Sequence, residues 1–331
     1  MEMIDLALAD LKFPPPSSVL RELRQEISKV NYYPSGDYLE LKQAFCNYLG
    51  PEVSLTSENL VFGNGLDEVI DLVTRVWGGV NLIPSPTFSQ YSMAAARSNQ
   101  RVISSSMLRQ GNYELNFDET DLKKASLVWV CNPNNPTGDL IPRKKIEQTL
   151  DDARGMVAVD ECYYEYTGKT VVDLVEEYEN LIVLRGFSKN FGIAGLRLGV
   201  AISRPENIRK IERIRQPFNV NRMAEKAGVI VLKHKNEYKK IWQRVLKIGR
   251  KFAAEIKRMG YRPFPVNANF VLVDFLDEKK ASEIFLKLKN NGIKTYPGWS
   301  DEDFEGDLNQ HIRFAVSVEK HMKLAVEVLR R

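Results

Sequence analysis

The stretch Ser188-Lys189-Asn190-Phe191-Gly192-Ile193-Ala194-Gly195-Leu196-Arg197-Leu198-Gly199 follows the short apolar run Leu181 to Leu184, which reads as a strand. Lys189 therefore stands in a glycine-rich turn after a strand end, with Arg197 one short loop onward. A partly desolvated lysine near another cation has a lowered pKa, as a Schiff-base nucleophile requires. An isolated lysine is more often a solvated surface residue, but the small, apolar neighbours here favour a functional one. A strand that ends in such a turn is typical of ligand sites in open α/β sheets.

The same alternation of short apolar runs and amphipathic helical stretches extends outward along the chain. Helical periodicity covers residues 19–30, 38–49 and 66–77. We expect further strands at Leu60 to Phe62, Val80 to Ile83, Val102 to Ser105, Leu127 to Val130, Met156 to Val159 and Leu198 to Ile202. The pattern predicts an α/β fold in which helices flank a mostly parallel central sheet.

The sequence pattern changes after residue 220, where we expect long charged helices that continue through Met259. A strand at residues 270–275, a helix at 281–290, a strand at 312–316 and a final helix follow. We expect a large domain formed by residues 30–220 and a smaller, discontinuous α+β domain formed by residues 1–29 and 221–331. The length of 331 residues suits two domains that share one site.

The composition excludes several classes of protein. Lys and Arg total 47 against 43 acids, and a net charge of +4 gives no reason to expect a nucleic-acid or membrane partner. Three scattered cysteines without a CxxC pair, together with three histidines, argue against a metal site and favour a reducing compartment. The N-terminus lacks the basic region of a signal peptide, and no apolar run is long enough to span a bilayer. We therefore expect a soluble cytoplasmic protein.

Three further segments carry chemical groups at expected strand ends. Gly63-Asn64-Gly65-Leu66-Asp67-Glu68 is a strand-to-helix turn whose N–H groups suit a phosphate, although glycine turns that only cap helices are commoner. Cys131-Asn132-Pro133-Asn134-Asn135-Pro136-Thr137-Gly138 is a rigid loop that either points an amide into a cleft or is a plain turn. In Asp160-Glu161-Cys162-Tyr163 the aspartate either meets a cation or protonated ring nitrogen or caps a helix.

Taken in order, these segments resemble the fold-type I pyridoxal-phosphate (PLP) aminotransferases, in the branch that contains the histidinol-phosphate aminotransferases. The resemblance runs over nearly the whole chain, and the stretch from Arg215 to Asn221 is similar to that branch in particular. It implies the PLP-transferase fold of type I and pyridoxal 5'-phosphate as cofactor. It also implies an amino donor, a 2-oxo acid acceptor and a homodimer as partners.

The resemblance assigns the catalytic and ring-binding roles. Lys189 would carry the cofactor as a Schiff base and move the proton of the substrate, and Asp160 would keep the pyridine nitrogen protonated. Tyr163 and Asn135 would hydrogen-bond the phenolic oxygen of the cofactor. Phe88, in the segment Pro86-Thr87-Phe88-Ser89-Gln90-Tyr91, would stack on the ring.

The remaining roles concern phosphate, partner and substrate. The cofactor phosphate would be held by the backbone of Leu66 and Asp67 together with Ser188 and Arg197. Tyr33 matches a tyrosine that reaches the partner's cofactor phosphate across a dimer interface. Arg313, in His311-Ile312-Arg313-Phe314, matches the arginine that binds the anionic group of the substrate, beside Asn135 and Tyr296.

The chain departs from the branch at three places. Gly186 replaces a Thr or Ser whose hydroxyl helps to hold the cofactor phosphate, a loss on the order of 1 kcal/mol. Tyr296 stands where histidinol-phosphate enzymes usually have a second arginine, and a tyrosine supplies neither the charge nor the bidentate fork. Lys294 and Arg222 are alternative cations. The N-terminal segment Ala9 to Pro14 also differs from the usual Asn-Glu-Asn-Pro-like stretch.

The leading hypothesis is therefore transamination between histidinol phosphate and 2-oxoglutarate. A general or aromatic amino acid aminotransferase is the alternative that Tyr296 favours. A threonine-phosphate decarboxylase is a third candidate, but it would be expected to need the same second arginine. A non-catalytic PLP-fold protein is disfavoured because Lys189, Asp160, Tyr163, Asn135 and Arg197 are all retained.

Overall fold

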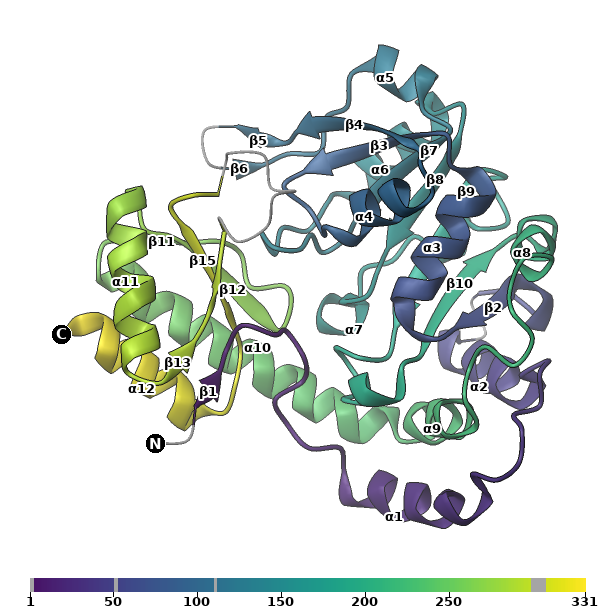
Figure 1. The fold of residues 1–331 in the computed structure, drawn as a ribbon, viewed down its shortest axis with the longest axis horizontal. Helices are drawn as coiled ribbons and strands as arrows, with labels where there is room; N and C mark the ends of the chain where they lie inside the picture. The colour runs from purple at the N-terminus through teal and green to yellow at the C-terminus, as the bar shows by residue number, and fades with distance from the viewer. Residues whose placement is uncertain (1–2, 51–52, 110–111, 299–307) are drawn as a thin grey trace.

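A computed structural model describes residues 3–50, 53–109, 112–298 and 308–331. Its central sheet has seven strands in the order β2-β10-β9-β8-β7-β3-β4 (Figure 1). These strands are β2 (Leu60–Gly63), β3 (Val80–Ser85), β4 (Arg101–Ser106), β7 (Leu127–Cys131), β8 (Met156–Asp160), β9 (Leu181–Gly186) and β10 (Gly199–Ser203). Neighbours run parallel except at β10, which is antiparallel to both β2 and β9. The expected mostly parallel sheet is confirmed.

Every residue of the four strands β7 to β10 is buried, because helices cover both faces of the sheet. Alternate side chains reach opposite faces: Trp129 packs with α3 (Gly65–Trp77), α4 (Gln90–Arg97) and α8 (Pro205–Glu212). Val128 and Val130 face the other side, where α2 (Leu39–Leu49), α5 (Glu119–Lys124) and α6 (Arg143–Asp152) contribute to the core. The apolar runs seen in the sequence are therefore strands buried on two faces.

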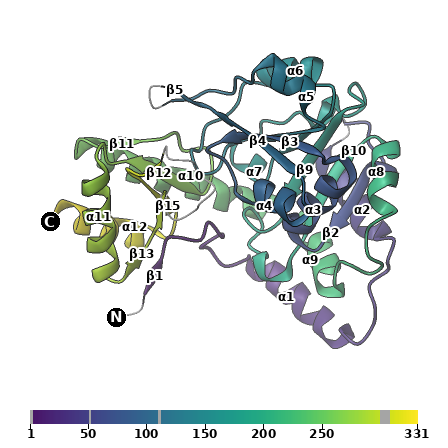
Figure 2. The same cartoon turned by 45° about the horizontal axis from the view of Figure 1, so that its top comes forward.

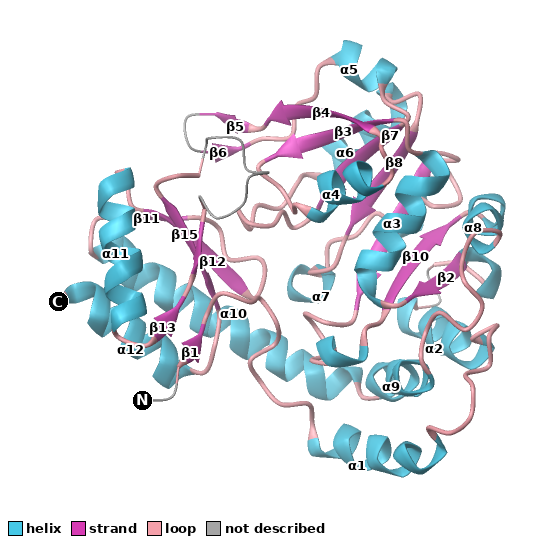
Figure 3. Ribbon diagram, viewed as in Figure 1, coloured by secondary structure: helices cyan, strands magenta, loops and turns pink. Residues whose placement is uncertain are grey.

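A second, antiparallel sheet of four strands lies beside the first, in the order β11-β12-β15-β14 (Figure 3). Its strands are β11 (Arg262–Pro263), β12 (Phe270–Asp274), β14 (Tyr296–Pro297) and β15 (His311–Ala315). The long helix α10 (Lys235–Arg258) and the helix α11 (Glu278–Asn290) pack against it, and α12 (Glu319–Arg330) packs on both of these helices. The strand and helices expected after residue 260 are thus present, with ends shifted by a few residues.

The N-terminal segment packs on two later parts of the chain. Strand β1 (Ile4–Asp5) pairs in parallel with β13 (Ile293–Lys294), which Figure 2 shows beside α11 and α12. Helix α1 (Ser17–Glu26) packs on α9 (Arg222–Lys233), and the helix expected to reach Val30 ends instead in the 3-10 turn Ile27–Lys29. The division at residues 30 and 220 stays a prediction.

The smaller elements complete the chain. They are the hairpin of β5 (Leu108–Arg109) and β6 (Asn112–Tyr113), the helix α7 (Tyr164–Thr167), and 3-10 turns at Ser57–Asn59, Val172–Leu174 and Ala194–Leu196. Among the residues that the structure describes, no helix is both long enough and apolar enough to cross a membrane.

Candidate active site

A cavity of about 600 Å³ opens at the carboxyl ends of β7, β8 and β9 and reaches to the second sheet. It brings together ten of the residues predicted from the sequence. These are Leu66, Asp67, Phe88, Asn135, Tyr163, Ser188, Lys189, Arg197, Tyr296 and Arg313. Residues more than 240 positions apart therefore line one space, as the carboxyl-end rule for α/β sheets predicts.

Lys189 is half-buried in the turn that follows β9. The N–H of Phe187 donates to the carbonyl of Leu198 at 3.1 Å, which ties the start of this turn to the strand β10 region. The hydroxyl of Tyr166 donates to the carbonyl of Lys189 at 2.7 Å. Burial lowers the pKa of the Lys189 amine, with the Cys162 thiol opposing and the Arg313 guanidinium adding to the effect. A lowered pKa increases the fraction of neutral amine, the form that attacks a carbonyl carbon.

Asp160 is fully buried at the end of β8, behind the side chains that line the cavity. The hydroxyl of Tyr91 donates to its Oδ2 at 2.7 Å, and the N–H of Cys162 donates to its Oδ1 at 2.9 Å. Asp160 caps no helix, since α7 begins after Tyr163. Burial raises the pKa of the Asp160 carboxyl to about 6, which the Tyr91 hydrogen bond opposes. A cationic ring nitrogen in the cavity is the partner that would restore its ionisation.

The amino end of α3 meets the turn between Lys189 and β10 at very short range. A Cβ at Gly65, whose φ is +80°, would stand 2.4 Å from Nη2 of Arg197, and one at Gly199 would stand 2.7 Å from the backbone nitrogen of Leu66. Nη2 of Arg197 lies 2.7 Å from Oδ2 of Asp67. Glycine, a helix amino terminus and an arginine together form a cradle for a phosphate. These residues fit the cofactor that the sequence implies.

Aromatic and amide side chains form the walls of the cavity. The ring of Phe88 stands edge-on to Tyr91 at 5.7 Å, and Tyr91 in turn stacks on Trp129 at 4.5 Å. Tyr163 packs edge-on against Phe270 at 5.3 Å between ring centroids. These buried contacts hold the rings in fixed orientations, as a stacking surface for a planar ligand requires.

Arg313 forms the end of the cavity at the second sheet and is only 8% exposed. Its Nη1 donates to Oδ1 of Asn135 at 2.5 Å, and its Nη2 donates to the carbonyl of Ala7 at 2.9 Å. The Tyr296 ring lies against the guanidinium, whose central carbon is 4.5 Å from the ring centroid. Neither of the alternative cations lines this cavity. Lys294 is exposed on β13, and Arg222 donates to the backbone of Tyr33.

Asp160 and Tyr33 are the two predicted site residues that do not line the cavity, and only Tyr33 lies away from its wall. Its side chain is 77% exposed and lies against Phe218, with 5.1 Å between the ring centroids. The residues to which the sequence analysis gave no role include Tyr91, which bonds Asp160, and Cys162 and Arg97, which line the cavity. Tyr91 and Cys162 stand within the quoted motifs, so their position was a usable signal. Nothing in the sequence marks Arg97.

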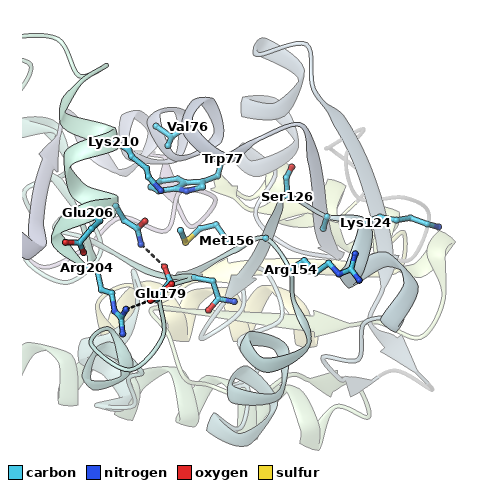
Figure 4. Close-up of a pocket in the computed structure, with 14 residues that line it drawn as sticks. Val76, Trp77, Lys124, Ser126, Arg154, Met156, Glu179, Arg204, Glu206 and Lys210 are labelled. Atoms are coloured by element: carbon cyan, nitrogen blue, oxygen red, sulfur yellow. Dashed lines mark hydrogen bonds and ion pairs between the residues drawn. The ribbon is translucent and has the colours of Figure 1, made fainter.

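A second cavity, of about 720 Å³, lies at the opposite edge of the central sheet, where the strands β7, β8 and β9 begin (Figure 4). Its lining includes Trp77, Arg154, Glu179, Arg204 and Lys210. Arg204 is paired with Glu179 at 3.0 Å, and Lys210 lies over the Trp77 ring at 5.9 Å. No residue singled out in the sequence lines it, so the smaller cavity is the candidate active site.

Comparison with known proteins agrees with this geometry. The family model described as aminotransferase class I and II matches residues 1–329. The histidinol-phosphate aminotransferase of Caldanaerobacter subterraneus subsp. tengcongensis is 34% identical over 289 residues, which cover 85% of this chain and 80% of that protein. That of Desulfitobacterium hafniense is 35% identical, over 78% of this chain and 74% of its own length.

Solved structures extend the likeness to the fold. The histidinol-phosphate aminotransferase of Clostridium acetobutylicum has a TM-score of 0.87 at 26% identity and covers 99% of this chain and 98% of its own. That of Sinorhizobium meliloti, solved in complex with pyridoxal-5'-phosphate, has a TM-score of 0.88 at 23% identity and covers 99% and 91%. The chain therefore belongs to the aminotransferase class I and II family, and the expected fold type, enzyme class and pyridoxal-phosphate cofactor are confirmed.

Proposed function

We propose that this aminotransferase moves the amino group of histidinol phosphate to 2-oxoglutarate, with the cofactor attached to Lys189. The observation that carries the proposal is that Lys189 and the guanidinium of Arg313 line one cavity. An amine and an anion-binding arginine in the same space suit a substrate that bears an amino group and an anionic group. The names of the relatives, which are 34% and 35% identical, support the same substrate.

The residues of the chain divide the work as follows. When bound, the cofactor supplies an electron-poor ring that draws electrons from the substrate's α-carbon. The Lys189 amine would take the proton from that carbon and deliver it to C4′ of the cofactor. Asp160 would hold the proton on the ring nitrogen, and Phe88 would stack on the ring. Tyr163 and Asn135 would hydrogen-bond the phenolic oxygen.

The phosphate of the cofactor belongs at the cradle formed by the amino end of α3. The backbone of Leu66 and Asp67 and the side chains of Ser188 and Arg197 would bind it there. The Asp67 carboxylate, now paired with Arg197, would share that arginine with the incoming anion. This arrangement anchors the cofactor at the end opposite Arg313.

A general or aromatic amino acid aminotransferase is the second candidate. Tyr296 packs against Arg313 instead of supplying another positive charge, and the other cations that line the described cavity are Arg97, Lys189 and Arg197. One guanidinium matches a carboxylate, whereas a dianionic phosphate is better served by two cations. The substrate of a threonine-phosphate decarboxylase also carries a phosphate, so that candidate would likewise be better served by a second cation beside Arg313.

The decisive experiment is an absorbance spectrum of the PLP-loaded protein before and after each candidate donor is added. Histidinol phosphate should remove the visible absorbance band of the bound cofactor and produce the band of the pyridoxamine form in the near ultraviolet. A spectrum that ignores histidinol phosphate and responds to glutamate or an aromatic amino acid would replace the first candidate with the second.

A homodimer that acts in trans through Tyr33 is part of the proposal. Tyr32, Tyr33 and Phe218 are 64%, 77% and 47% exposed, and Tyr33 and Phe218 touch, so they form an apolar surface suited to a second copy. A light-scattering measurement that finds an active monomer would remove this part. A cytoplasmic location stays a prediction from the scattered free cysteines.

A further inference from the structure

The backbone turn that carries Lys189 is held from behind, on the side away from the cavity. Tyr166 of α7 donates to the carbonyl of Lys189 at 2.7 Å, and Nε1 of Trp242 in α10 donates to the carbonyl of Asn190, also at 2.7 Å. The fully buried Asn190 side chain donates through Nδ2 to the carbonyl of Gly186 at 3.2 Å. The turn therefore depends on contacts made by residues that the substrate does not touch.

The second acceptor of the Asn190 amide is a carboxylate. Nδ2 of Asn190 donates to Oε2 of Glu165, and the Tyr48 hydroxyl donates to Oε1 of Glu165 at 2.8 Å. Tyr48 belongs to α2 and Glu165 to α7, so one carboxylate links two helices to the lysine turn. Glu165 does not line the cavity. A direct role in binding substrate or cofactor is thereby disfavoured.

The protonation state of Glu165 sets the strength of this link. An ionised carboxylate accepts charge-assisted hydrogen bonds from both neighbours, whereas the neutral acid keeps only a weaker, uncharged acceptor for Asn190 and turns its own O–H toward the Tyr48 oxygen. Burial raises the pKa of Glu165 to about 7, a shift that the Arg185 charge and the Tyr48 hydrogen bond oppose. The other groups that face it or its tyrosine partner include Glu161, Tyr164, Tyr166 and Lys235, the last lying 5.4 Å from the Tyr48 ring centroid.

We propose that the ionised carboxylate of Glu165 acts through Asn190 to fix the turn that carries Lys189, which makes Glu165 a positioning residue whose protonation loosens the lysine. The inference rests on the proposed role of Lys189 but not on the identity of the amino donor. It predicts that kcat/KM falls on the acid side of its pH profile as Glu165 becomes protonated. Above this acid limb of the profile the carboxylate is ionised and the turn is fixed.

The test compares Glu165→Gln with the matched control Glu177→Gln, which alters an exposed glutamate. The PLP-loaded proteins are titrated from pH 5.5 to 9, and three quantities are followed: the visible absorbance band without substrate, the rate of reduction by sodium borohydride, and kcat/KM. Wild type and Glu177→Gln should show a limb near neutral pH. Glu165→Gln should lack it and should lose about tenfold in kcat/KM at pH 8, the size of one hydrogen bond to a charged group.

A second variant guards against simple misfolding. Tyr48→Phe removes one donor to the carboxylate, so the limb should move to higher pH while the fold is kept. An unchanged limb in both variants, accompanied only by a lower thermal midpoint, would overturn the inference and leave Glu165 a structural residue. Failure of borohydride to attach the cofactor to wild-type Lys189 would overturn the proposed role of Lys189 and this inference together. Attachment without turnover of histidinol phosphate would overturn only the substrate.

Discussion

The guanidinium carbon of Arg313 lies 4.5 Å from the centroid of the Tyr296 ring, and the two residues face each other in register across β14 and β15. Tyr296 occupies the position at which histidinol-phosphate enzymes usually have a second arginine, and the sequence predicts it as a substrate-binding residue. In the structure its ring lies against the guanidinium of Arg313. Arg313 is thus oriented by its contacts with Tyr296, Phe270, Asn135 and the carbonyl of Ala7.

Two substitutions of Tyr296 distinguish the contribution of its ring from that of its hydroxyl. Tyr296→Phe keeps the cation–π contact, so KM for the amino donor should stay within about twofold. Tyr296→Ala removes the contact and should raise KM about 2- to 30-fold with a smaller effect on kcat, because such contacts contribute about 0.5–2 kcal/mol. Steady-state kinetics on both variants measures this. An equal increase for Tyr296→Phe would show that the hydroxyl itself binds substrate.

Lys189→Ala should abolish turnover, because among the described residues that line the cavity Lys189 is the one lysine that could take the proton of the substrate. Sodium borohydride followed by peptide mass analysis should find the reduced cofactor on the Lys189 peptide of the wild type and nowhere in the variant. Lys169→Ala, which alters an exposed lysine, is the control and should behave as wild type. A Lys189→Ala protein that still transaminates would disprove the catalytic assignment.

Asp160→Asn should raise the stability of the cofactor-free protein at neutral pH while it lowers the activity of the loaded protein. In the cofactor-free protein, burial raises the pKa of Asp160 from 3.8 to about 6. The folded state therefore binds this proton more tightly than the unfolded state does. The free energy of unfolding that this contributes is present below about pH 4 and is lost as the pH rises to about 6 and above. At pH 7.5 this loss is on the order of 2–3 kcal/mol, and the neutral asparagine avoids it.

Urea unfolding of the cofactor-free proteins at pH 4 and pH 7.5 measures this difference. Asp160→Asn should be more stable than wild type at pH 7.5, with the gap closing toward pH 4, while its loaded form should be nearly inactive. Asp152→Asn, at an exposed site, controls for the general loss of a charge. A gap of the same size at both pH values would contradict the assignment to Asp160.

Gly186→Ser should tighten cofactor binding about fivefold. A Cβ at Gly186 would have its nearest neighbours 3.8 Å away, and the residue lines the cavity near Ser188. The added hydroxyl can donate to the phosphate for about 1 kcal/mol. Equilibrium dialysis against PLP measures the change, and Gly186→Ala, which adds the carbon without the donor, should bind as wild type. Tightening by both variants alike would attribute the effect to packing.

The sequence predicted the central sheet well because most of its strands are short, largely apolar runs, such as Leu127–Cys131, buried on both faces, although the edge strand Arg101–Ser106 is largely exposed. The candidate site followed from motifs at the ends of those strands. The supports of the site had no such local pattern. The bond from Tyr91 to Asp160 joins residues 69 positions apart, and that from Asn190 to Glu165 spans 25, so only the folded chain brings these donors and acceptors together.

The role of Tyr296 was also beyond a sequence argument. Strand β14 contains only Tyr296 and Pro297, which is too short for an alternating pattern to show which side chain faces Arg313. The alignment of motifs placed the residue correctly in the cavity, but its chemical role depended on the antiparallel partner strand.

The contact between Arg313 and the carbonyl of Ala7 spans 306 positions, nearly the whole chain. During synthesis, the lysine turn, the central strands and the phosphate cradle therefore emerge from the ribosome before Arg313. The residues for cofactor binding are then all present, while the arginine expected to bind the substrate is still missing. The first residues made must wait for almost the last before the arginine is held. An emerging chain thus acquires its parts for cofactor binding well before those for choosing a substrate.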